Sequence, residues 1–137
     1  MRVFFDTNVL LDDYYQRVGA VASKEAGAHC ANSPHEGWIA WHTISNAYYL
    51  VRSHSKSGEK AGQFVADLLA WVEVAETSRS DALAALAFSM RDFEDALQLA
   101  AAVACGAGVI LTRNTTDFKA SPIPVMRPEE FLASLKR

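Results

Sequence analysis

The sequence predicts an α/β domain in which a parallel sheet of about five strands is flanked by helices on both faces. Short β-branched or aromatic segments recur along the chain, and a helical pattern separates most of them from the next. The 137 residues are 50% hydrophobic, which is enough for one core without disulfides. We therefore expect a single domain over residues 1–137, with right-handed crossovers between the strands.

The first half of the chain supplies two strands and three helices. A buried strand ends at Asp6 and is followed by a helix, then by a second helix of small residues that stops before Pro34 and Gly37. The next strand contains Trp38, and the helix after it opens at Thr43 or Ser45 and stops at Gly58. In order, the predicted elements are strand 2–5, helix 9–16, helix 18–31, strand 38–41 and helix 43–55.

The second half begins with an amphipathic helix whose apolar residues follow i, i+3, i+4 spacing. An alternating segment and an apolar run predict two more strands, and Pro124 is tolerated only if the last strand is at an edge. Pro128 opens the closing helix. In order, the elements are helix 59–70, strand 71–75, helices 80–89 and 92–105, strand 109–112, strand 123–126 and helix 128–135.

Composition argues against several classes of protein. The chain has 16 acidic and 13 basic residues, and its net charge of -3 counts against nucleic-acid binding. Its two cysteines and four histidines have no zinc-ligand spacing. Asp6 comes too early for a signal peptide, and the apolar stretch 99–111 is too short to cross a bilayer. We expect a soluble cytoplasmic protein with no membrane association.

Carboxylates mark the positions where an open α/β sheet places its function, beyond the carboxyl ends of its strands. Asp6 follows the first strand, Asp117 follows the fourth, and Asp92 and Asp95 open the helix before the fourth strand. Asp92 and Asp95 share a helix face, whereas Glu94 is expected to point into solvent. Oxygen ligands without nearby cysteine or histidine favour Mg²⁺ or Mn²⁺.

Each acidic segment also has a structural interpretation. Asp92 with Asp95 fits a capping box, and Asn114 to Asp117 fits a turn stabilised by an Asx side chain. Asp6 is harder to explain structurally, because aspartate is a poor strand former. We also expect no helix N-cap before Asn8, so a capping role would not account for Asp6. The three segments together are more informative than any one of them.

Three motifs in order resemble PIN-domain nucleases, most closely VapC-like toxins of toxin–antitoxin pairs, over essentially the whole chain. The segment 6–12, Asp-Thr-Asn-Val-Leu-Leu-Asp, resembles the opening motif of the family. Asp92-Phe93-Glu94-Asp95-Ala96 resembles its acidic helix, and the segment 110–118 resembles its closing Thr-x-[Asp/Asn]-x-x-Asp-Phe motif.

The resemblance implies an endoribonuclease that uses Mg²⁺ or Mn²⁺. Asp6, Asp95 and Asp117 match its metal-binding carboxylates, Asp92 matches an accessory acid, and Asn114 matches a position often occupied by aspartate. The family usually has a glutamate in the helix after the second strand, where this chain has Asn46. The alternative is therefore a catalytically weak or inactive PIN module that binds RNA or a protein partner.

Several residues are predicted to contact an RNA substrate at this rim: Thr7, Asn8, Arg52, Thr112 and Arg113. The group around Arg52 and Lys56 is equally explained as a solvated polar face. At least four of six aromatic residues are expected in the core or an interface, and the others could stack on bases; the six are Tyr14, Tyr15, Trp38, Trp41, Tyr48 and Tyr49.

The resemblance also implies partners, namely a second copy of the chain and a cognate antitoxin whose C-terminal segment covers the site. Helix 59–70, with Phe64 and Trp71, is either a groove wall for that segment or ordinary core packing. A phosphatase with an acidic pocket is a minor alternative, because it needs a second aspartate where Asn8 stands. A receiver domain is a second minor alternative. It needs an aspartate at the end of a mid-chain strand and a lysine late in the chain, and neither is evident.

Overall fold

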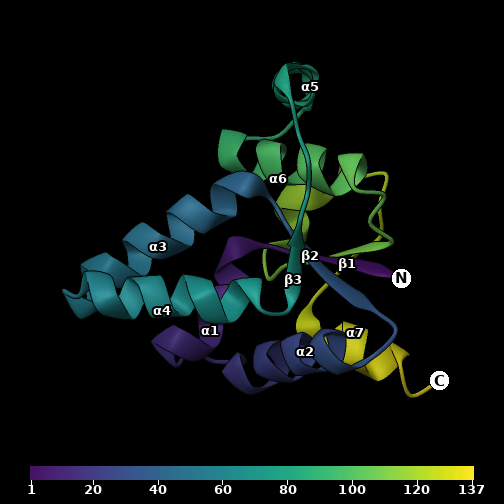
Figure 1. The fold of residues 1–137 in the computed structure, drawn as a ribbon. Helices are drawn as coiled ribbons and strands as arrows, with labels where there is room; N and C mark the ends of the chain where they lie inside the picture. Colours follow the sequence, from purple (N-terminus) through teal and green to yellow (C-terminus); the bar gives the residue numbers. More distant parts are fainter.

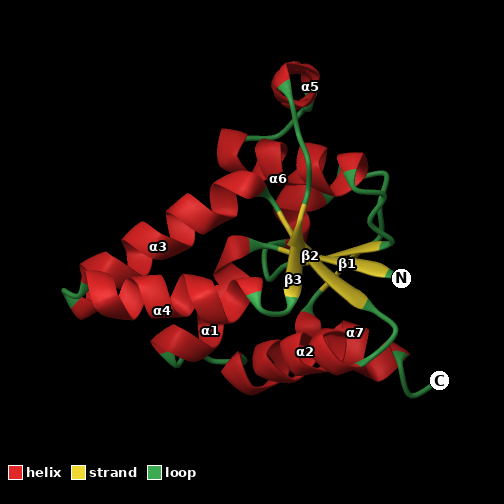
Figure 2. Cartoon of the chain, viewed as in Figure 1, coloured by secondary structure: helices red, strands yellow, loops and turns green.

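One parallel sheet of five strands, in the order β3-β2-β1-β4-β5, organises the molecule (Figure 2). The computed structural model describes all 137 residues. The central strand β1 pairs with β2 and β4, so that Val3 lies opposite Gly37 and Val109. The predicted fold class is confirmed. The strands are β1 (Arg2–Phe5), β2 (Glu36–Ile39), β3 (Val72–Val74), β4 (Val109–Leu111) and β5 (Val125–Met126).

Seven α-helices connect the strands or follow them. A short 3₁₀ helix, η1 (Thr115–Phe118), lies between β4 and β5. No helix is both long and apolar enough to cross a membrane. The helices are α1 (Thr7–Tyr15), α2 (Ala20–Asn32), α3 (Trp41–Ser55), α4 (Gly58–Leu69), α5 (Arg79–Ala87), α6 (Phe93–Ala104) and α7 (Pro128–Ser134).

The sheet is buried on both faces, because successive residues of β1 point to opposite sides. Val3 and Phe5 belong to an apolar cluster with residues of α2 and α7, and Phe4 belongs to a second cluster with Leu99 of α6. Figure 1 shows α2 and α7 on one side of the sheet and α6 on the other, with α5 outside α6. Helices α3 and α4 lie side by side beyond the sheet.

The second strand differs from its prediction by two residues. Pairing with β1 puts Arg2 opposite Glu36, and the strand ends at Ile39 opposite Val74. Trp41 therefore begins α3 instead of ending a strand, and its side chain is 69% exposed. Neither Thr43 nor Ser45 caps this helix, because its N-cap is Ala40 and no side chain caps it.

Trp71 closes the core between α4 and the sheet. Its ring meets Phe5 edge-to-face with centroids 5.3 Å apart. A Cβ on residue 37 would lie only 2.6 Å from the Trp71 ring, so this position of β2 requires glycine. Trp71 itself lies just before β3, which is shorter than the predicted 71–75.

Candidate metal centre

Asp6 is anchored where β1 passes into α1. Its carboxylate accepts hydrogen bonds from the Thr112 hydroxyl (2.7 Å), the Gln98 amide (2.9 Å) and the backbone N–H of Asn8 (3.4 Å). Asp6 is therefore the N-cap of α1, and the expectation that it has no capping role was wrong. Its side chain is 1% exposed, and this burial raises the pKa of its carboxyl group despite the three hydrogen bonds.

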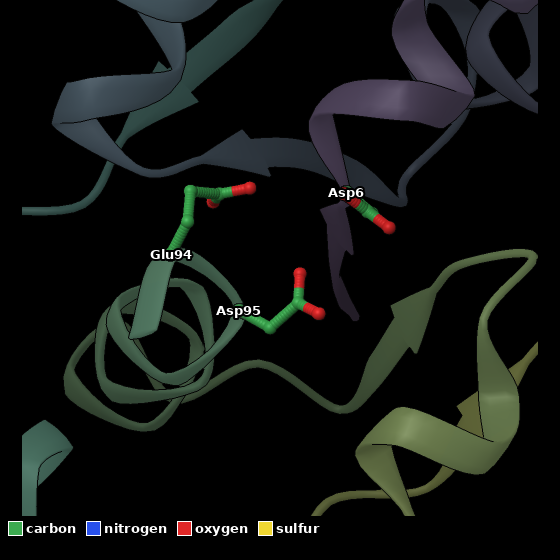
Figure 3. A group of neighbouring side chains, drawn as sticks. All are labelled: Asp6, Glu94 and Asp95. Carbon is green, nitrogen blue, oxygen red and sulfur yellow. The ribbon is translucent and has the colours of Figure 1, made fainter. Parts of the chain in front are cut away.

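The first turn of α6 brings two more carboxylates to the same place. Asp92 is the N-cap, and its Oδ1 accepts from the backbone N–H groups of Glu94 (2.8 Å) and Asp95 (3.2 Å). Asp92 thus caps the helix as expected, but the capping box is incomplete, because the Asp95 carboxylate accepts no hydrogen bond from the Asp92 backbone. Because the cap lies outside the helix, the side chains that point toward Asp6 are those of Glu94 and Asp95 (Figure 3).

Asp6, Glu94 and Asp95 form the acidic group of the site (Figure 3). One carboxylate oxygen from each lies within 4.8 Å of the others. The expectation that Glu94 points into solvent was wrong, because its carboxylate accepts from the Gln98 amide (3.2 Å) and pairs with His42 Nε2 (2.8 Å). The carboxyl ends of parallel strands and the start of α6 meet at one edge of the sheet, which explains this convergence.

Asp95 has the most unusual environment of the three. It is 8% exposed, and its carboxylate accepts no hydrogen bond from the protein, although its backbone N–H is bonded to Asp92. Burial, followed by repulsion from Asp6, Glu94, Asp92 and Asp117, raises the pKa of its carboxyl group from 3.8 to about 7. A negative charge at this position therefore lacks a compensating partner within the chain.

The donor set fits a hard divalent cation. Only carboxylate oxygens converge, and no lysine or arginine lies within 4.0 Å of these three carboxylates. Mg²⁺ and Mn²⁺ prefer such oxygen ligands, and a bound cation offsets the mutual repulsion that raises the carboxyl pKa values. The residues that could hold a metal here are Asp6, Glu94 and Asp95.

The remaining predicted acids and amides surround this group without joining it. Asp117 is exposed on η1, close enough for its charge to raise the pKa of Asp95. Asn114 is exposed and makes no side-chain cap, so the predicted Asx turn is absent. The turn is instead stabilised by Thr112, whose hydroxyl accepts from the Asn114 backbone N–H (3.0 Å). Asn46 is half-buried on α3.

Two residues predicted to contact RNA are buried and hold other side chains in place. Thr112 is completely buried and donates to Asp6, so it lies out of reach of a substrate. Thr7 is 4% exposed, its hydroxyl is 3.1 Å from that of Thr43, and its backbone N–H donates to Gln98 Oε1 (3.2 Å). Thr112 therefore positions Asp6, whereas Thr7 also lines the cavity beside Glu94, so that its contact with RNA stays a prediction.

Arg113 makes a set of structural contacts. It donates to Asp12 Oδ2 (2.8 Å), to both carboxylate oxygens of Glu129 (2.8 and 3.1 Å), to the Gly19 carbonyl (2.7 Å) and to the Ser23 hydroxyl (2.9 Å). These bonds tie the end of β4 to α1, α2 and α7. Phosphate binding by Arg113 stays a prediction that would require some of these bonds to break.

Exposed residues on the α3 side of the site remain accessible. A cavity of about 380 Å³ lies beside Glu94 and is lined by Thr7, Asn8, Ser45, Asn46, Tyr49 and Leu50. A neighbouring hollow of about 370 Å³ is lined by Tyr49, Arg52, Ser53 and Lys56. Tyr49 and Trp41 are exposed, whereas the other four aromatic residues pack into apolar clusters, which confirms that at least four serve packing.

Three site residues were missed in the sequence, namely Glu94 as a member of the group, Gln98 and His42. Gln98 follows Glu94 by one helical turn, and this i, i+4 spacing is the signal that could have paired them. His42 is 52 positions from Glu94 and gives no local signal.

Comparisons with known families and structures show which proteins this chain is similar to. A family model described as PIN domain matches residues 2–116. Among curated proteins there is no match. The fold is similar to that in a structure of VapBC2 from Rickettsia felis bound to a promoter DNA fragment, with 18% identity and a TM-score of 0.71. That similarity covers 93% of this chain and 98% of the other.

Two further structures share the fold. VapBC-1 from nontypeable Haemophilus influenzae is 13% identical with a TM-score of 0.71, and the match covers 94% of this chain and 99% of the other. A toxin–antitoxin complex from Klebsiella pneumoniae is 23% identical with a TM-score of 0.68, covering 92% and 97% respectively. The family model spans most of the chain, 115 of its 137 residues. This chain therefore belongs to the PIN domain family.

Proposed function

We propose that this protein is a Mg²⁺- or Mn²⁺-dependent endoribonuclease and the toxin of a toxin–antitoxin pair. The observation that carries the proposal is the convergence of Asp6, Glu94 and Asp95 within 4.8 Å at the carboxyl edge of the sheet. A bound divalent ion would supply a water of lowered pKa and neutralise charge on the phosphate. The family match and the similar fold of toxin–antitoxin proteins support it.

The chain's own residues would position the metal and the RNA. Thr112 and Gln98 hold Asp6 in one orientation, and the Asp92 cap fixes the first turn of α6. Asp117 and Asn114, both exposed near this edge, would take up further coordination or orient water, and Asp92 would act as an accessory acid. Burial of Asp6 and Asp95 excludes bulk water from one side of the site.

RNA would approach across α3. Asn8 and Asn46 line the cavity beside Glu94, and Arg52 with Lys56 borders the next hollow, so amide groups and positive charge lead away from the acidic group. Phosphate contacts from arginine and lysine supply affinity that does not depend on sequence.

An antitoxin segment would occupy the apolar groove between α1, α2 and α4. This groove has a volume of about 510 Å³, and its lining includes Phe5, Leu10, Phe64, Leu68 and Trp71 from β1, α1, α4 and the turn after it. Its walls combine apolar side chains with polar ones, as expected for an extended or helical peptide. The groove-wall interpretation of α4 is therefore part of the proposal.

A homodimer is the other proposed assembly. Trp41 and Tyr49 are 69% and 60% exposed on α3, and both line one hollow on this helix. Aromatic side chains in such a patch favour protein contacts. Light scattering on the purified chain would show a mass of two chains, and Trp41→Asp would reduce it to one.

The activity test compares the unaltered protein with Asp95→Asn on a structured RNA, with Mn²⁺ or Mg²⁺ and with EDTA. Asp95 accepts no hydrogen bond, so its amide variant should fold normally and lose cleavage. Glu25→Gln, which removes one charge at an exposed position of α2, is the control. Cleavage that persists in Asp95→Asn or in EDTA would contradict the proposal.

The alternative, a PIN module that binds RNA or protein without cleaving RNA, is motivated by Asn46 in place of a glutamate. It predicts saturable metal binding with no RNA turnover under any of these conditions. The two functions are thus separated by the same experiment.

A further inference from the structure

We propose that Glu94 is the third carboxylate ligand of the metal site, held in place by Gln98 and His42; the proposal rests on the metal-dependent function given above. Figure 3 shows Glu94 and Asp95 projecting from consecutive positions of α6 toward Asp6 at the end of β1. The ligand set would thus draw two neighbouring residues from α6 and one residue that follows β1. No acid of α3 takes part.

Gln98 sets the spacing between Glu94 and Asp6. This side chain is completely buried, and its Nε2 donates to Asp6 Oδ1 (2.9 Å) and to Glu94 Oε1 (3.2 Å). Its Oε1 accepts from the backbone N–H of Thr7 (3.2 Å), which fixes the orientation of the amide. One amide group therefore bridges two carboxylates, and each carboxylate keeps a second oxygen for other partners.

His42 holds the other oxygen of Glu94. The distance from His42 Nε2 to Glu94 Oε2 is 2.8 Å, and the two side chains are 27% and 36% exposed. A glutamate in the first turn of a helix would ordinarily extend into water, away from other carboxylates. Here two side chains from α3 and α6 direct it into an acidic group.

Charge balance supports a cation in the space between these carboxylates. His42 is the only basic residue that pairs with the group, and no lysine or arginine contacts it. Asp95 gives a further indication, because this residue is only 8% exposed and its carboxylate has no hydrogen-bond donor in the protein. Divalent cations held by carboxylates supply the missing positive charge.

Asn46 on α3 is uncharged, whereas Glu94 on α6 carries an acid beside it. Asn46 lines the same cavity of about 380 Å³ as Glu94, so a carboxylate on either residue would face the same space. The resemblance to PIN nucleases expects a glutamate at position 46. Glu94 would supply at this cavity the negative charge that Asn46 lacks.

The test measures Mn²⁺ binding directly, by the loss of the free-ion electron paramagnetic resonance signal, so no RNA is needed. Glu94→Gln should weaken binding by about tenfold or more, which is the effect that losing even an outer-sphere partner produces. Glu25→Gln, the matched loss of one exposed charge, should leave binding unchanged. Adding Asn46→Glu to Glu94→Gln should restore affinity to within about threefold of the original.

His42 is tested as a positioning residue. His42→Ala should weaken Mn²⁺ binding by about tenfold, whereas His42→Gln, which can still donate to Glu94, should recover most of it. Circular dichroism melts would establish that each variant is folded. If Glu94→Gln does not fold, Glu94→Asp keeps the charge on a shorter side chain and should bind Mn²⁺ more weakly than the original.

Two results would overturn the proposal in distinguishable ways. If Glu94→Gln and Glu94→Asp both bind Mn²⁺ like the unaltered protein while Asp95→Asn binds it more weakly, the metal site stands and Glu94 is not its ligand. If the unaltered protein binds no Mn²⁺, both this proposal and the metal-dependent function are wrong.

Discussion

Arg113 Nε lies 2.8 Å from Oδ2 of Asp12, and the Asp12 side chain is only 1% exposed. The same carboxylate also accepts from the Ser23 hydroxyl, and Arg17 contacts its other oxygen at 3.3 Å. Two arginines thus balance this buried charge, and the serine hydroxyl adds a hydrogen bond. The pair joins the end of β4 to α1 close to the acidic site, without contacting the site's carboxylates.

We predict that Arg113→Ala lowers the free energy of unfolding by about 2–4 kcal/mol, because it leaves a buried carboxylate with weaker compensation. Urea denaturation would measure the loss. Arg79→Ala removes an exposed arginine without an ion pair and should change stability by less than about 0.5 kcal/mol. Equal stability of the two variants would show that the Asp12 contact contributes little.

Thr112→Val tests the orientation of Asp6. Valine keeps the shape of threonine but removes the hydroxyl that donates to Asp6 and accepts from the Asn114 N–H. We expect a loss of about 1–3 kcal/mol in the free energy of unfolding and about tenfold weaker Mn²⁺ binding. Thr116→Val, at an exposed position of η1, should change neither quantity. Unchanged metal affinity in Thr112→Val would mean that Asp6 needs no such support.

The pKa of Asp95 predicts how stability depends on pH in the metal-free protein. The pKa of the Asp95 carboxyl group is about 7 in the folded protein, against an ordinary value of 3.8 for the unfolded chain. Between pH 3.8 and pH 7 the folded state therefore binds more protons than the unfolded state. The contribution of Asp95 to stability is therefore greatest below pH 3.8 and falls as the pH rises to about 7. Asp95→Asn removes this dependence, so its melting temperature should exceed that of the original most clearly above pH 7.

Melting curves in EDTA from pH 4 to pH 8 would measure this difference. The two curves should approach each other at the acidic end, where Asp95 is protonated. A difference that stays constant, or that grows toward pH 4, would contradict the raised pKa.

A bound divalent metal ion should reverse the loss of folding stability that ionised Asp95 causes. A ligand that binds only the folded state at 100 times its Kd adds about 2.7 kcal/mol, or several degrees in Tm. We therefore expect Mn²⁺ or Mg²⁺ to raise the Tm of the original protein, and Asp95→Asn to lose this response. Ca²⁺ is a useful comparison, since its preference for more ligands at longer distances should make it a weaker stabiliser at three carboxylates. A rise of equal size in Asp95→Asn would place the stabilising ion elsewhere.

Much of the fold could be predicted from local patterns. The apolar runs around Val3 and Ile110 predicted buried parallel strands, and both lie at the centre of the sheet. Pro128 begins the last helix as expected. The boundary of β2 was wrong by two residues because its end depends on pairing with β1 and β3, which a local pattern does not contain.

The acidic site was predicted less completely. Asp6 and Asp95 were found because a polar residue at the end of an apolar strand and an acid in a first helical turn are local signals. The direction of Glu94 was predicted wrongly because Asp92 and Asp95 were assumed to share one face of the helix, which left Glu94 pointing away from that face. Asp92 has extended backbone angles, φ −107° and ψ 120°, so it does not share the helical spacing of the residues after it.

The sequence alone determined the α/β class, the order of the acidic motifs and the membership of Asp6 and Asp95 in one edge of the sheet. These follow from periodicity and from the geometry of parallel strands, which act over short distances along the chain. Only the tertiary structure decided that Glu94 faces Asp6 and that Arg113 is engaged by Asp12. Those contacts join residues 88 and 101 positions apart, and their geometry depends on how α1, α3 and α6 pack around the sheet.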